Sequence, residues 1–249
     1  MKCVRRLAGL VLFLTLWGPI DSSLSRAAGT WSSALPAPPA GGVNNCILLS
    51  DGTVLGLNGN GGCARLTPDI HGSYLNGTWT ALTPMNNSRL FYSSQLLTNG
   101  NLWVAGGEDG TGGSHSEIYD PLNNSWRMVP DPSPDPNFSD SISEILPNGN
   151  PFVPPVYTST VCLIYNVGLD SWSMAASCRA SQDEASWVKL PSDNIITIDA
   201  FSQNSEHYVP SLNQWVADGT LPVPLFDPTL SELGPGFLLP NGKAFYIGS

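Results

Sequence analysis

The chain has 249 residues, of which 41% are hydrophobic and 12% are charged, and it contains 25 glycines and 22 prolines. This apolar content is enough to bury a core, whereas so many helix-breaking residues exclude long helices and indicate a chain punctuated by turns. The formal net charge of −10 excludes the basic surface that binding to nucleic-acid phosphates requires.

The first 27 residues have the composition of a secretory signal peptide. Basic residues at positions 2, 5 and 6 precede the apolar run 7–17, and Ser25-Arg26-Ala27 supplies small residues for cleavage. The run is shorter than the ~20 apolar residues that span a bilayer, so a cleaved leader is favoured over a membrane anchor. Its removal takes away four basic residues and one acidic residue, which leaves a net charge of −13. We expect a secreted, periplasmic or cell-surface protein with no membrane span after the leader.

Two features then recur about every 45 residues. An apolar strand, a turn with Asn-Gly or Asp-Gly and a second apolar strand appear as LLSDGTVLGL, LLTNGNLWVA, ILPNGNPFVP and LLPNGKAFYI, and KLPSDNIITI carries Ser192-Asp193 at the turn. Such dipeptides predict hairpins with type I′ turns. Tryptophans that follow a turn recur at intervals of 48, 47, 46 and 43 residues: Trp31, Trp79, Trp126, Trp172 and Trp215.

A third strand, such as SEIYDP or CLIYNV, stands between each hairpin and the tryptophan strand, and its tyrosine precedes the tryptophan by seven residues. We expect the third and fourth strands to bring these two rings together as packing between sheets, not as a ligand platform. Four antiparallel strands in each repeat predict the blades of a β-propeller.

The second copy, from LLTNGNLWVAGG to SEIYDPLNNSW, resembles the kelch motif, and the copies together resemble bacterial secreted kelch-repeat proteins of the galactose-oxidase-like family. The resemblance implies an all-β, kelch-type β-propeller of four-stranded antiparallel blades over residues 28–249, incomplete at the C-terminus. Residues 29–35 would form the outer strand of the closing blade. The expected blades cover about 46–85, 89–131, 138–177 and 182–219, with a partial blade from 231.

Four cysteines follow the leader: Cys46, Cys63, Cys162 and Cys178. An even number in an exported chain favours disulfides, with three connectivities open. Pairing of sequence neighbours would close two loops of roughly 16 residues each. Zinc is excluded, because no Cys-x-x-Cys occurs and no histidine lies at ligand spacing from a cysteine.

The resemblance also implies an enzyme alternative, a radical copper oxidase, in which a Tyr-His pair, a further histidine and a Cys–Tyr crosslink hold copper. None of His71, His115 and His207 stands beside a tyrosine at the head of an inner strand. Copper therefore does not fit the residues present, and this alternative requires ligands in further blades. The sequence assigns no catalytic residue, since it has no nucleophile elbow and no complete phosphate loop.

Charged residues recur nine to eleven positions before the turn glycine or Asp193, where the chain leads into the first strand of a blade. Arg89 holds this place in the second copy, and the loop after the second strand opens on the same face. We name the carboxylates expected there the acidic rim: Glu108, Asp109, Asp140, Asp183, Glu184 and Glu232.

The acidic rim could hold Ca²⁺, sugar hydroxyls or a cationic peptide, or keep one carboxyl with a raised pKa for acid–base chemistry. The opposite interpretation is that these carboxylates only accept loop N–H groups and face solvent. The sequence predicts a monomeric binding or scaffold module for an extracellular carbohydrate, another polymer or a protein. No cofactor is evident, although calcium would suit the oxygen-rich rim.

Overall fold

The computed structural model describes residues 37–39, 42–133, 139–154, 156, 160–229 and 232–248. The expected leader at 1–27 and the expected outer strand at 29–35 lie outside these residues. The described residues fall in one compact unit, Ala34–Ser249. Within this part of the chain there is no α-helix, only the short 3₁₀ helix η1 (Pro210–Leu212), and hence no helix that could cross a membrane.

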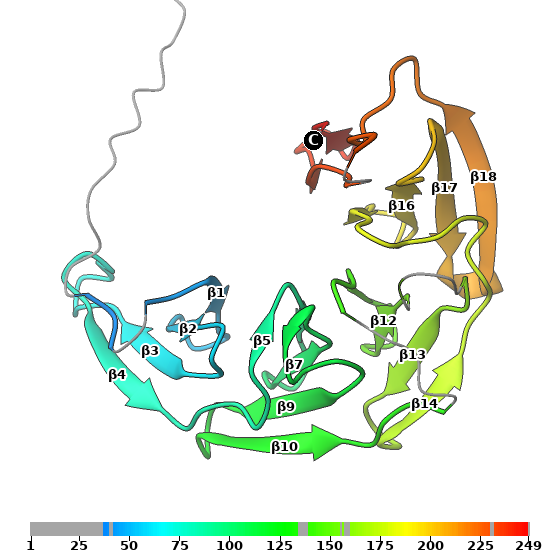
Figure 1. Cartoon of the computed structure of the whole chain (residues 1–249). Helices are drawn as coiled ribbons and strands as arrows, with labels where there is room; N and C mark the ends of the chain where they lie inside the picture. The colour runs from blue at the N-terminus through cyan, green and yellow to red at the C-terminus, as the bar shows by residue number, and fades with distance from the viewer. Residues whose placement is uncertain are drawn as a thin grey trace, which may run out of the picture. The chain divides into compact units, whose positions relative to one another are not determined.

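Four antiparallel sheets of four strands follow one another along the chain (Figure 1). The first contains β1 (Asn45–Leu48), β2 (Val54–Leu57), β3 (Cys63–Thr67) and β4 (Thr78–Leu82), in that spatial order. The second contains β6 (Ser93–Leu96), β7 (Leu102–Ala105), β9 (Ser116–Asp120) and β10 (Ser125–Val129). The third contains β11 (Glu144–Ile145), β12 (Pro151–Val153), β13 (Leu163–Asn166) and β14 (Ser171–Met174). The fourth contains β15 (Trp187–Lys189), β16 (Ile195–Ile198), β17 (Asn204–Val209) and β18 (Gln214–Thr220). This architecture confirms the predicted all-β fold of four-stranded, kelch-type blades.

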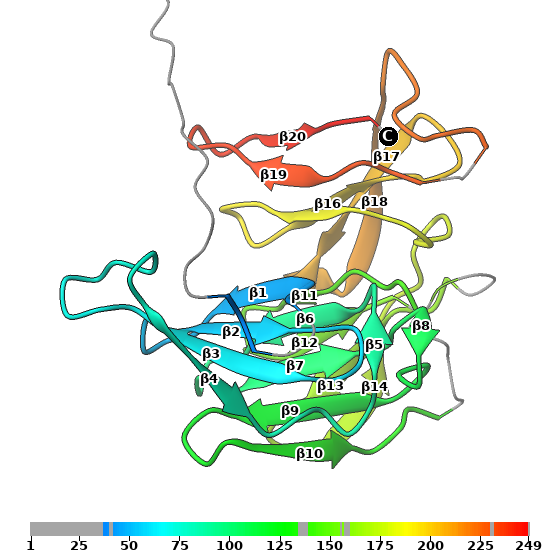
Figure 2. The same ribbon diagram turned by 60° about the vertical axis from the view of Figure 1, so that its left-hand side comes forward.

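Two smaller sheets complete the described chain. A short pair joins β5 (Arg89–Leu90) to β8 (Asp109–Gly110), and the last hairpin joins β19 (Gly236–Leu238) to β20 (Ala244–Tyr246). Figure 2 shows this hairpin stacked on the fourth sheet, where the hydroxyl of Tyr246 donates to the carbonyl of Ile196 at 2.7 Å.

The hairpin turns differ from the predicted type I′ turns. In the second sheet the N–H of Gly100 donates to the carbonyl of Leu97, and the N–H of Leu97 donates to the carbonyl of Asn101. The turn is therefore a three-residue loop in which Gly100 alone has a positive φ, of 85°. Asn99 stays right-handed because its side-chain oxygen accepts the N–H two residues on. Asp193, with φ 66°, takes the glycine's place in the fourth sheet.

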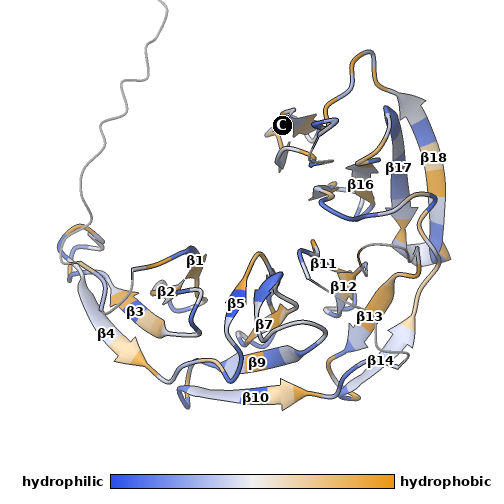
Figure 3. Ribbon diagram, in the orientation of Figure 1, coloured by the Kyte–Doolittle hydropathy of each residue, from blue (hydrophilic) through white to orange (hydrophobic). Residues whose placement is uncertain are grey.

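Aromatic pairs fill the space between successive sheets, as predicted. Tyr119 lies directly opposite Trp126 in the register of β9 and β10, with ring centroids 4.9 Å apart. The corresponding pairs in the third and fourth sheets are each separated by 5.4 Å. These rings pack on the hydrophobic inner strands of the preceding sheet, which Figure 3 shows in orange along β12, for example. The packing role explains the periodic tryptophans physically, because each buries a large apolar area between two sheets.

A repeated hydrogen-bond pattern also ties each sheet to the one before it. The turn residues Asn124 and Asn213 have left-handed backbones, and the side-chain oxygen of each accepts the tyrosine hydroxyl of its own sheet. The same oxygen also accepts a backbone N–H from the preceding segment. This N–H belongs to Thr83 for Asn124 and to Ala176 for Asn213. Trp126 adds a bond from its ring N–H to the carbonyl of Thr83.

The third sheet departs from this pattern for a local reason. Trp172 donates to the carbonyl of Pro130, which is the counterpart of Thr83 but has no N–H to offer. The turn residue there is Asp170, which accepts from the hydroxyl of Tyr165 and from Arg127. An arginine thus supplies the donor that the proline lacks.

Candidate functional site

In each four-stranded sheet, the loop that leads into the first strand lies at the same end as the loop between the second and third strands. These loops together form one face. Phe91, Asp140 and Glu184 each stand nine residues before the turn residue, and their φ angles are 49°, 55° and 55°. Left-handed backbone is costly for residues other than glycine, so three successive sheets hold the same strained position. The N–H of Asp140 donates to the carbonyl of Phe91 at 3.1 Å, which links two of these loops directly.

The structure brings members of the acidic rim together. Glu184 is partly exposed, and its carboxyl is hydrogen-bonded to that of Asp140. Burial, the bond to Asp140 and the charges of Asp183 and Glu232 raise the pKa of Glu184 to about 8. The raised pKa favours the protonated form of Glu184 near neutral pH.

Glu108 and Asp109 extend the acidic rim from the next loop. The β5–β8 pairing sets Asp109 opposite Leu90, and the N–H of Glu108 donates to the carbonyl of Leu90 at 3.0 Å. Slight burial, followed by the charges of Asp140 and Asp109, raises the pKa of Glu108. Glu108 and Glu184 thus share Asp140, Asp183 and Glu232 as electrostatic neighbours.

Arg89 is the exception among the predicted site residues, because its side chain does not reach the acidic rim. The guanidinium is fully buried and forms an ion pair with the equally buried Glu117 at 2.8 Å. It also donates to the carbonyls of Gly106 and His115. The prediction of Arg89 as a ligand-binding residue is wrong, because its charge is already neutralised inside the second sheet.

Phe91 is a candidate site residue that the sequence analysis missed. Phe91 is 58% exposed, although it holds the same strained position as Asp140 and Glu184. The usable signal was the alignment of the repeats, which sets an aromatic residue at a place occupied elsewhere by carboxylates. An exposed ring beside acidic side chains offers an apolar face and hydrogen-bond acceptors to one ligand.

The structure separates Cys46 from Cys63, one of the two pairs of sequence neighbours. Cys46 lies on β1 and Cys63 on β3, with β2 between them, so their Cα atoms are about 9–10 Å apart at normal strand spacing. That separation is too large for a disulfide.

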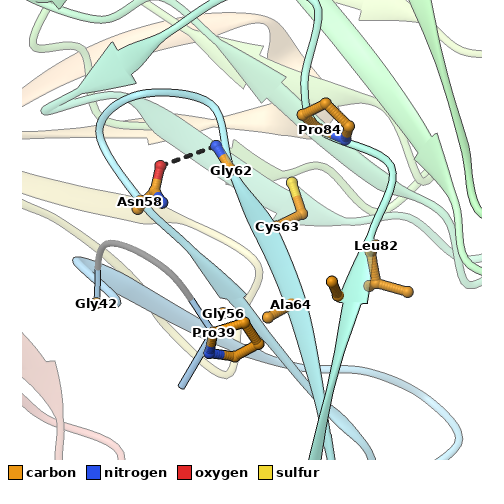
Figure 4. A pocket seen from close by; sticks show the side chains of 10 residues that line it. Pro39, Gly42, Gly56, Asn58, Gly62, Cys63, Ala64, Leu82 and Pro84 are labelled. Atoms are coloured by element: carbon orange, nitrogen blue, oxygen red, sulfur yellow. Dashed lines mark hydrogen bonds between the residues drawn. The ribbon is translucent and has the colours of Figure 1, made fainter. Parts of the chain in front are cut away.

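Cys63 lines a small pocket of about 230 Å³, and its thiol is the one titratable group among the lining residues. Ala64, Leu82 and Pro84 lie beside it (Figure 4). Cys162 and Cys178, by contrast, lie side by side with their Sγ atoms 2.6 Å apart.

The described histidines do not fit the copper site that the family resemblance implies. Within the described ranges, no three His, Cys, Asp or Glu side chains are grouped closely enough to hold an ion. His115 and His207 each direct Nδ1 to an aspartate, Asp131 and Asp218. The prediction of calcium at the acidic rim therefore rests on the charge of the rim alone and stays a prediction.

Among the comparisons with known proteins, the family-model match agrees with the fold. A family model described as the kelch motif matches residues 96–133. No curated protein sequence matches the chain. A fungal alcohol oxidase of the AA5 family, solved in complex with copper, is a structural match with 16% identity and a TM-score of 0.42 over 73% of this chain and 54% of that one. The chain thus spans about half the length of that oxidase, and no property of the oxidase is transferred from so distant a likeness.

Proposed function

We propose that the chain is a secreted binding module of the β-propeller type that holds an extracellular carbohydrate polymer on the loop face formed by Phe91 and the acidic rim. The observation that carries this proposal is the convergence of Phe91, Asp140 and Glu184 from three successive sheets. Rigid sheets that present loops on one face are a common scaffold for binding.

The chemistry of this face favours neutral sugars or amino sugars over acidic ones. An exposed aromatic ring can pack against the apolar C–H face of a sugar, and the carboxyl oxygens of Asp140 and Glu184 can accept its hydroxyl hydrogens. The concentration of negative charge repels uronic acids and sulfated sugars. It attracts an amino sugar that carries an ammonium group.

Binding to immobilised β-glucan, chitosan and alginate tests this proposal. We expect the protein to be retained on β-glucan or chitosan and not on alginate. Phe91→Ala, and the pair Asp140→Asn with Glu184→Gln, should each weaken retention at least ~10-fold, which corresponds to about 1.4 kcal/mol. Leu122→Ala, which changes a 94% exposed residue at the turn between β9 and β10, is the control and should bind normally. Equal retention of all four proteins would contradict the proposal.

A second candidate function follows from the protonated state of Glu184. A carboxyl that holds its proton at neutral pH can act as a general acid, and the neighbouring carboxyl of Asp140 can act as a base. If the face is hydrolytic, Glu184→Gln should retain the polymer while release of reducing ends stops. If the Glu184→Gln variant loses retention and the wild type releases no reducing ends, the face binds the polymer without hydrolysing it.

The pH dependence of folding stability gives an independent measure of the Glu184 environment. Because the folded-state pKa of about 8 lies above the ordinary value of 4.5, the contribution of Glu184 is fully present below pH 4.5 and is lost as pH rises through 8. Solvent screening of this partly exposed group limits the loss to the order of 1 kcal/mol. Urea midpoints between pH 4 and 9 should fall for the wild type, and Glu184→Gln should remove this part of the decline. An unchanged profile in the variant would show that Glu184 titrates normally.

A further inference from the structure

Two loops carry the chain from one sheet to the next in the same way. The loop between β4 and β6 donates the N–H groups of Asn86 and Asn87 to Glu117, and the loop between β14 and β15 donates the N–H of Arg179 to Glu206. Both glutamates stand two residues before the tyrosine of their sheet and are buried. Each therefore fixes the preceding loop to its own sheet.

The two loops differ in what else binds the glutamate. Arg89 and Gln182 occupy the same position, eleven residues before the turn residue, and both point to the glutamate. Arg89 forms a buried ion pair with Glu117, whereas Gln182 offers Glu206 a neutral amide at 3.2 Å. Hydrogen bonds between neutral and charged groups hold less strongly than a charge pair, so the second loop has the weaker polar anchor.

A pair of cysteines stands where the second loop is weaker. The N–H of Cys178 donates to the carbonyl of Thr160, as the N–H of Met85 does to the carbonyl of Gly61 in the first loop. The repeat thus aligns Cys178 with Met85 and Cys162 with Cys63. Cys162 and Cys178 are 0% and 5% exposed, and each thiol is the other's neighbour.

We propose that Cys162 and Cys178 form a disulfide that anchors residues 175–186 covalently, in place of the buried ion pair that anchors the equivalent loop. The anchored loop carries Asp183 and Glu184, so the bond also fixes two of the six carboxylates of the acidic rim. Cys46 and Cys63 remain thiols. This inference rests on the repeat geometry and does not require that the rim binds a ligand.

The bond forms by thiol–disulfide exchange with a small disulfide such as oxidised glutathione. One protein thiolate attacks the small disulfide and releases one glutathione thiol, and the second protein thiolate then displaces the other. The two cysteines together lose two electrons and two protons, which the small disulfide takes up as two thiols. The Cys162 contact and burial raise the pKa of the Cys178 thiol, so exchange is slow once the loop has closed. The finished bond should resist glutathione in the folded protein, because both sulfur-bearing residues are buried.

Peptide mapping of the full chain tests the bond directly. After refolding with oxidised and reduced glutathione, alkylation should leave Cys162 and Cys178 unmodified until a reductant and denaturant are added, while Cys46 is alkylated at once. Met85→Cys is the matched variant, because it recreates the pair opposite Cys63 and should give a second crosslink. Alkylation of Cys162 and Cys178 in the folded, oxidised protein would overturn the proposal. So would the absence of a crosslink in Met85→Cys.

Hydrogen exchange tests the anchoring role. The Cys162→Ala, Cys178→Ala double variant should exchange the amides of Arg179, Asp183 and Ala185 at least ~10-fold faster than the oxidised wild type, because hydrogen bonds without a covalent anchor then hold the loop. Amides of the first loop, at Asn86 and Asn87, serve as the internal control, and Cys46→Ser is the control variant. Unchanged exchange at 179–185 would show that the loop does not depend on the bond.

Discussion

Glu117→Gln should destabilise the fold by about 3–5 kcal/mol, because it leaves the buried charge of Arg89 without a carboxylate. Glu117 accepts hydrogen bonds from Arg89 and from the backbone and side-chain amides of Asn86 and Asn87. A glutamine can keep only part of these contacts, since its NH₂ group would face other donors. Urea unfolding at pH 7 measures the loss.

The effect of Glu117→Gln should shrink in acid. Burial by itself raises the pKa of Glu117, but the bonds from Arg89 and Asn86 outweigh it and hold the pKa below its ordinary value of 4.5. A depressed folded-state pKa means that the contribution is complete above pH 4.5 and is lost as pH falls through the folded value. The urea midpoints of wild type and variant should therefore converge at low pH.

Glu206→Gln is the matched control, because Glu206 has the same position but accepts the neutral amide of Gln182 where Glu117 accepts the guanidinium of Arg89. Its pKa is raised by burial, so the neutral side chain is better tolerated there. We expect a cost of about 1–2 kcal/mol, the magnitude of an impaired buried hydrogen bond. An equal loss of unfolding free energy in Glu117→Gln and Glu206→Gln would show that the Arg89–Glu117 ion pair adds nothing to stability beyond ordinary hydrogen bonds.

Phe152→Ala should cost about 3–5 kcal/mol, the usual range for a buried aromatic ring cut back to a methyl group. Phe152 is 0% exposed and lies between sheets, with ring centroids 4.4 Å from Tyr208 and 5.0 Å from Trp187. The cavity would open where the third sheet supports the fourth, so we expect the fourth sheet and its loops to lose protection first.

Phe237→Ala removes the same atoms from a ring that is 49% exposed, and should change the free energy of unfolding by less than about 0.5 kcal/mol. Thermal and urea unfolding of the two variants separate interior packing from the general loss of an aromatic residue. A Phe152→Ala protein as stable as Phe237→Ala would contradict the assignment of the third-to-fourth sheet contact as a core.

The sequence determined the blades because their signals are local. A tyrosine seven residues before a tryptophan makes one hairpin, and the pleat then places the two rings directly opposite each other, as Tyr119 and Trp126 show. The common position of the acidic residues before each first strand also follows from the repeat. Equal spacing along the chain becomes a common face once each repeat folds in the same way.

Tertiary structure alone decided what each charged or sulfur-bearing side chain meets. Two nearby positions of the repeat have opposite fates, since Arg89 turns inward to Glu117 whereas Glu184 lies beside Asp140, and in both cases the partner comes from a distant part of the chain. Cys63 and Cys162 share a position, yet one faces Met85 and the other Cys178. The turns were mistaken for a different, local reason, since the side-chain bond of Asn99 and the position of Gly100 together select a three-residue loop. Short-range spacing fixes where strands form, whereas burial and charge pairing are set by the neighbours that folding brings close.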